Sequence, residues 1–178
     1  MGLAVCFGQG LQMTNILKDI WEDRQANTCW LPRSVFGAGA LRLGELEAHH
    51  GSAEFAAGLR QLIGVAHGHL RHALTYTLLI PKSDPGLRRF CLWAIGMAVL
   101  TLRKLNANPA FTSGNQVKIS RRGVRATVLL SNLALPSDHL LRLLFDWAAR
   151  GLPLASSVIA VSDPVPPMPA ERLVVGQR

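Results

Sequence analysis

Four polar side chains near the N-terminus follow one another at helical spacing: Gln12, Asn15, Asp19 and Asp23. At about 100° per residue they fall within an arc of roughly 80°, so on a helix they form one polar stripe. Most of the remaining circumference is apolar, with Leu11, Met13, Ile16, Leu17, Ile20 and Trp21. We therefore expect the helix to be buried among others and the stripe to face a helical core.

Two carboxylates one helical turn apart repel each other and resist loss of water unless a cation or hydrogen-bond donors compensate. Mg²⁺ prefers oxygen ligands, keeps several waters and is commonly shared between one or two carboxylates and substrate phosphates. The stripe therefore suggests a magnesium and diphosphate site. On spacing alone, a solvated helix face beside Lys18 or Arg24 is the simpler interpretation, because most charged stripes are only solvated.

The elements that carry these residues are predicted to be helices. Apolar residues recur at helical spacing, strict alternation is nearly absent and no internal repeat is visible, so the fold class is all-α. Ser52, Asp84 and Ser137-Asp138 are expected helix caps, and Gly151 is an expected left-handed helix end. The expected helices cover the N-terminus to Arg24, Ala40 to Ala48, Ser52 to Leu79, Pro85 to Asn106, Ser120 to Leu133, and Asp138 to Gly151.

Length and composition predict one globular domain, since 49% of the 178 residues are hydrophobic. We expect the domain to cover residues 1–151 and the proline-rich segment 152–178 to be a poorly ordered tail. The three cysteines lie far apart, which indicates neither a disulfide framework nor a zinc site. The longest apolar run, residues 90–102, is shorter than the roughly 20 residues of a membrane span, so no transmembrane helix is predicted.

The formal charge of +8 calls for an anionic partner, which nucleic acid, an acidic membrane surface and a phosphorylated metabolite would all satisfy. Basic residues are dispersed along the chain, apart from one dense group at Lys118, Arg121, Arg122 and Arg125. Nucleic-acid binders usually cluster basic residues and interleave them with aromatic ones. We therefore expect no nucleic acid as a partner, whereas peripheral contact with a membrane stays open.

Two long strings of residues resemble a known family. GQGLQMTNILKDIWEDR, followed by CWLP, resembles the second aspartate-rich motif of squalene and phytoene synthases. RRFCLWAIGMAVLTLRKLNANPAF, followed by GNQVKISRRGV, resembles the region of squalene synthases where an Arg-Phe-Cys helix leads to a basic segment. The order and spacing agree, so the resemblance covers roughly residues 2–133 and favours the squalene synthase branch.

The resemblance implies a magnesium-dependent transferase that joins two farnesyl diphosphates head to head, with NADPH as reductant where squalene is the product. By motif position, Asp19 and Asp23 would be the Mg²⁺ ligands and would carry the catalysis. Asn15 and Gln12 would orient the diphosphate or metal-bound waters. Lys118 and Arg121 match the basic segment near diphosphate or NADPH phosphates, although a solvated helix start explains them almost as well. Glu22 points off the stripe and is expected to be structural.

The sequence departs from the family in carrying only one of the two aspartate-rich motifs. We therefore expect an isoprenoid-synthase-type helical bundle that lacks its N-terminal helices, a fragment that is inactive alone and exposes apolar faces. The odd number and wide separation of the cysteines favour a reducing cytosol, so we expect the protein in the cytoplasm, with contact to a membrane surface left open. The alternative function is a non-catalytic helical module that recognises phosphate or acidic lipid through its basic face. The histidines at 67, 69 and 72 are not expected to form a zinc site, and His49 and His50 are expected in a turn at the surface.

Overall fold

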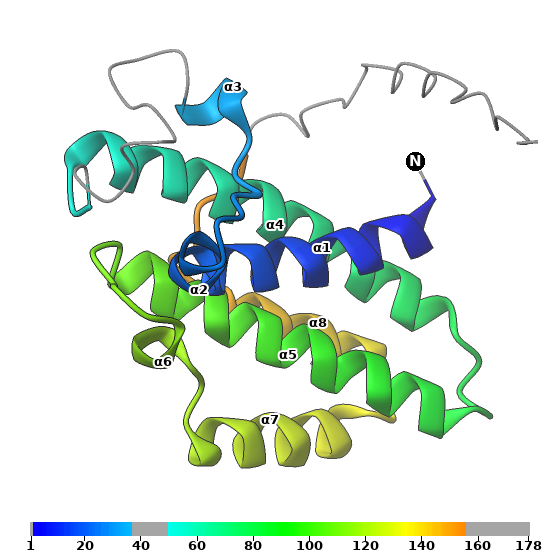
Figure 1. Cartoon of the computed structure of the whole chain (residues 1–178). Helices are drawn as coiled ribbons and strands as arrows, with labels where there is room; N and C mark the ends of the chain where they lie inside the picture. The colour runs from blue at the N-terminus through cyan, green and yellow to red at the C-terminus, as the bar shows by residue number, and fades with distance from the viewer. Residues whose placement is uncertain (1, 37–49, 156–178) are drawn as a thin grey trace, which may run out of the picture.

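The computed structural model describes residues 2–36 and 50–155, and every regular element in these ranges is an α-helix (Figure 1). The all-α prediction is confirmed. The elements are α1 (Leu3–Lys18), α2 (Ile20–Gln25), α3 (Arg33–Phe36), α4 (Ala53–Leu79), α5 (Pro85–Ala107), α6 (Gly114–Val117), α7 (Arg121–Ala134) and α8 (Asp138–Ala148).

Helices α4, α5, α7 and α8 each begin with a side-chain cap. Each capping oxygen accepts a hydrogen bond from a backbone N–H that has no partner within its own helix. The caps are Ser52 to Phe55 N, Asp84 to Leu87 N, Ser120 to Gly123 N and Ser137 to Leu140 N, at 3.1–3.3 Å. Because capping signals are local, these starts agree with the sequence to within a residue.

Other boundaries differ from expectation. The first helix bends at Asp19, where α1 ends and α2 begins. The short helices α3 and α6 fall in segments between the expected helices, where no helix was predicted. The expected helix over residues 40–48, His49 and the proline-rich part of the tail lie outside the described residues.

The helices pack around α4 and α5. Figure 1 shows α1 running across α4, with α5 beside them, α8 behind α5, and α7 at the edge farthest from α3. Gly10 lies where α1 meets α4, and a Cβ there would be 2.9 Å from Leu70 Cδ2 and 3.2 Å from Leu70 N. The missing side chain at residue 10 therefore allows the two helices to approach closely.

Helix α5 is a core helix. Its residues Leu92, Ile95, Val99 and Leu102 are buried, and a Cβ on Gly96 would meet Thr127 Cγ2 at 2.5 Å, so this glycine allows the close approach of α7. Within the described residues α5 is also the one helix long and apolar enough to cross a membrane. Its packing against α1, α4, α7 and α8 is that of a helix in a bundle interior.

Arg88 is a buried charge that joins distant parts of the bundle. Its side chain is 1% exposed, and its guanidinium donates to Ile80 O at 2.8 Å and to Asp138 Oδ1 at 2.6 Å. Asp138 is the first residue of α8, so the arginine ties the turn between α4 and α5 to the start of α8. A buried guanidinium is costly unless it is paired in this way.

His67 anchors the chain that follows α8. Its Nδ1 lies 2.9 Å from Pro153 O, and because a carbonyl only accepts, Nδ1 carries the proton. A Cβ on Gly64 would be 2.9 Å from Ala155 N, so residues 152–155 lie directly against α4. Burial lowers the pKa of His67 below its ordinary value, and burial likewise lowers that of His69.

Replacing Arg88 tests this tie. Arg88→Ala leaves the Ile80 carbonyl and the Asp138 carboxylate without their donor, so we expect the free energy of unfolding to fall by about 3 kcal/mol. Urea unfolding measures the loss. Arg89→Ala, which removes an exposed arginine next to it, should change the value by less than about 0.5 kcal/mol. Equal losses in the two variants would contradict the assigned role.

The buried histidines predict a pH dependence of stability. Because their folded-state pKa values are lowered, the unfolded chain takes up protons first as the pH falls below about 6.5. Stability should therefore be full above that pH and decline below it, which thermal unfolding between about pH 7.5 and pH 5.5 would show. His67→Gln should reduce the decline, whereas His139→Gln, an exposed control, should leave it unchanged. An undiminished decline in the His67 variant would refute the assignment.

Candidate functional site

The polar stripe lies on an open face of α1 and α2. Gln12 and Asn15 are exposed, and Asp19 and Asp23 are partly exposed. The buried residues of the two helices, including Leu17, Ile20 and Trp21, occupy nearly the opposite side, where they join the core. The four side chains share a face as predicted, but in the described residues that face turns away from the core, contrary to expectation.

The bend at Asp19 leaves the stripe intact. Asp19 N–H donates to Asn15 O, and Asp23 N–H donates to Asp19 O, both at 2.9 Å. Helical hydrogen bonds therefore run directly through three stripe residues and keep them one turn apart. Asn15, Asp19 and Asp23 therefore form one column of residues joined by backbone hydrogen bonds, although the helix axis changes at Asp19.

Asp19 already has a cationic neighbour. Lys18 Nζ lies 2.8 Å from Asp19 Oδ1, and both side chains are about one-third exposed, at 32% and 37%. An ion pair this exposed contributes little to stability, because water screens it. The lysine therefore balances the Asp19 charge only through a weak, partly exposed pair.

Helix α6 brings a second segment beside the stripe. Glu22 Oε1 accepts hydrogen bonds from Gly114 N at 2.8 Å and Ser113 Oγ at 3.4 Å, so Glu22 has the structural role expected of it. A Cβ on Gly114 would be 3.4 Å from Asp19 Oδ1. The start of α6 thus touches the turn that carries the first carboxylate.

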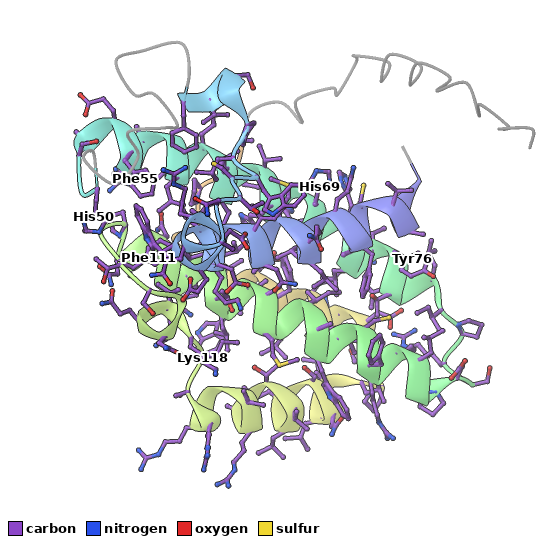
Figure 2. All side chains as sticks on the ribbon, viewed as in Figure 1. His50, Phe55, His69, Tyr76, Phe111 and Lys118 are labelled. Carbon is purple, nitrogen blue, oxygen red and sulfur yellow. The ribbon has the colours of Figure 1, made fainter. Side chains whose placement is uncertain are left out.

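The basic segment continues from this contact. Lys118 follows α6 directly, four residues after Gly114, which corresponds to a rise of about 6 Å along a helix. Figure 2 shows Lys118 beside α6, between α2 and α7. Arg121 is the first residue of α7, and both basic side chains are exposed. Lys118 therefore directly follows a short helix whose first residue lies against Asp19, although about a hundred residues separate Lys118 from Asp19 in sequence.

His50 holds the loop that leads into α6, a role that its sequence context did not indicate. Its Nε2 lies 2.9 Å from Ala110 O and 3.1 Å from Phe111 O, and its ring meets Trp21 edge-on at 5.2 Å (Figure 2). The expected surface histidine is therefore a structural contact between segments 60 residues apart. No local pattern could have revealed it.

The oxygen donors of the stripe fit Mg²⁺ that is shared with a diphosphate. Such a site needs only one or two carboxylates, because waters and phosphate oxygens fill the other positions. Asp19 and Asp23 could supply the carboxylates, and Asn15 and Gln12 could bond to waters or phosphate. Within residues 2–36 and 50–155, no three His, Cys, Asp or Glu side chains gather as an all-protein metal site would require.

A separate apolar groove of about 230 Å³ lies between α5, α7 and α8. Its lining includes Leu92, Ile95, Val99, Leu130, Leu144 and Phe145, and none of the stripe residues. The groove therefore lies apart from the aspartates.

Comparison with known proteins gives the same family over most of the same residues. The chain matches the squalene/phytoene synthase family over residues 1–123, which contain the stripe, α6 and Lys118. A squalene synthase of Candida albicans is 33% identical over 132 residues, or 72% of this chain and 29% of that protein. One of Nicotiana benthamiana is 32% identical over 130 residues, or 71% and 31%.

The chain spans about three tenths of the length of these curated relatives. No solved structure matches it. The family match covers more than two thirds of the chain and includes both strings of residues that carry the resemblance, except for the last residue of the second, Val124. The chain therefore belongs to the squalene/phytoene synthase family.

Proposed function

We propose that this chain contributes one wall of a magnesium and diphosphate site in a transferase that joins two farnesyl diphosphates head to head, forming presqualene diphosphate and squalene. Family membership supports this class of reaction. The observation that carries the proposal is the column formed by Asn15, Asp19 and Asp23 on an open helix face, with α6 beside it leading to Lys118.

The chemistry explains why these residue types are needed. When an allylic diphosphate ionises, its C–O bond breaks, negative charge collects on the departing diphosphate and the prenyl chain becomes a carbocation. Magnesium, when bound, neutralises part of that negative charge. Asp19 and Asp23 hold the metal, and Lys118 and Arg121 donate to phosphate oxygens where the charge develops. No side chain has to act as a nucleophile.

The amide residues orient the substrate in this proposal. Asn15 lies one turn before Asp19, and Gln12 lies nearly one turn before Asn15, so both can donate to metal-bound waters or phosphate oxygens. We also propose NADPH as hydride donor on the squalene branch, with Lys118 and Arg121 near its phosphates. The cytoplasmic side of a membrane surface suits a prenyl substrate that is both apolar and charged.

A second candidate function is a non-catalytic module that recognises phosphate or acidic lipid. Arg121, Arg122 and Arg125 are exposed at the start of α7, and Leu129 and Leu133 are exposed farther along the same helix. Such binding would weaken with salt and survive removal of divalent cations. Dependence on magnesium therefore distinguishes the two functions.

The first test is titration of the protein with farnesyl diphosphate, with magnesium and with EDTA. We expect binding only with magnesium, and we expect Asp19→Asn and Asp23→Asn each to abolish it, because an amide is a much weaker Mg²⁺ ligand than a carboxylate. Asp146→Asn, an exposed carboxylate on α8, is the matched control. Binding that persists in both stripe variants would refute the proposal, and binding that persists in EDTA would favour the second function.

The same variants should fold normally. Asp19 loses only a partly exposed ion pair with Lys18, and Asp23 is also partly exposed, so the free energy of unfolding should change by less than about 0.5 kcal/mol. Urea unfolding checks this expectation. A large loss of stability would show that the carboxylates support the fold and not a ligand.

A further inference from the structure

Glu22 joins the helix of the aspartates to the segment of the basic residues. It lies between Asp19 and Asp23 in sequence but to one side of their stripe. Its Oε1 accepts from Gly114 N at 2.8 Å and from Ser113 Oγ at 3.4 Å, across more than 90 residues of sequence. The bond is therefore a direct polar link between α2 and the start of α6.

Gly114 permits this link by its lack of a side chain. A Cβ there would lie 3.1 Å from both Glu22 Oε1 and Lys18 O, and 3.4 Å from Asp19 Oδ1. The first two distances are shorter than ordinary van der Waals contacts, so even alanine would require α6 or the α1–α2 junction to shift. The absence of a side chain at Gly114 and the hydrogen bond to Glu22 therefore both allow α6 to lie close to the α1–α2 junction.

Apolar contacts also hold this loop, but they serve a different purpose. Phe111 and Val117 are fully buried, and Phe111 packs near Trp21 of α2. Apolar burial is non-directional, so it fixes how deep the loop sits. A hydrogen bond to a backbone N–H has a preferred direction, so the bond to Glu22 fixes how α6 is aimed.

We propose that Glu22 is a positioning residue that aims the segment beginning at Lys118 at the diphosphate that shares the magnesium ion bound by Asp19 and Asp23. The inference rests on the proposed function. Glu22 touches neither metal nor substrate; it acts through α6. Loss of Glu22 should therefore change how much Lys118 contributes to binding of the diphosphate.

A double-mutant cycle tests this coupling, with magnesium and farnesyl diphosphate as the probe. We expect Lys118→Gln alone to weaken binding about tenfold, because it removes one charge-assisted contact to phosphate. In the Glu22→Ala background, where α6 is no longer aimed, Lys118→Gln should change the affinity less than about twofold. Glu22→Gln keeps the acceptor oxygen and should restore the tenfold effect. Gly114→Ala should uncouple Lys118 as Glu22→Ala does.

The controls separate positioning from general damage. Glu54→Ala removes an exposed carboxylate at the start of α4 and should leave the tenfold effect of Lys118→Gln intact. A merely structural Glu22 would lower affinity without changing the effect of Lys118→Gln, so additive effects would overturn this inference while the proposed function stood. If the unmodified protein shows no magnesium-dependent binding at all, the proposed function fails and this inference falls with it.

Discussion

The close packing of α1 against α4 is the contact on which the rest of the structure depends. Gly10 lets the two helices approach, and Thr14 donates to Gly10 O at 2.8 Å instead of presenting an unpaired hydroxyl to the core. Since one side of α1 must be buried for this packing, its opposite side is left open. The polar stripe occupies that open side, so core packing alone determines where the oxygen donors point.

The same constraint explains why the two carboxylates of the stripe are not sealed in the core. Carboxylates buried in a core would demand permanent partners, whereas Asp19 and Asp23 are partly exposed. Lys18 balances Asp19 through a pair that water weakens. The α1–α2 segment can therefore carry two negative charges one turn apart without a strong partner from the protein. The proposed metal would bind carboxylate oxygens that the fold leaves accessible.

Helix α6 shows how a weak local element can become well placed. Four residues cannot form a stable helix by themselves. Buried Phe111 and Val117, the contacts of His50 with two carbonyl oxygens, and the acceptor Glu22 hold it from several sides. Its position beside Asp19 therefore results from contacts with several parts of the bundle. The basic segment that begins at Lys118 directly follows α6, so its position depends on the same contacts.

The sequence by itself determined the all-α class, the capped helix starts, the single column of Asn15, Asp19 and Asp23, and the family, because each depends on spacing or on residues near one another in the chain. Only the tertiary structure decided that the column faces outward, that His50 and Arg88 are internal ties, and that Gly114 meets Asp19. These features depend on contacts between residues 8 to 95 positions apart, most of them 50 or more. Helical periodicity shows which side chains share a face, but the packing of other helices selects the face that is buried.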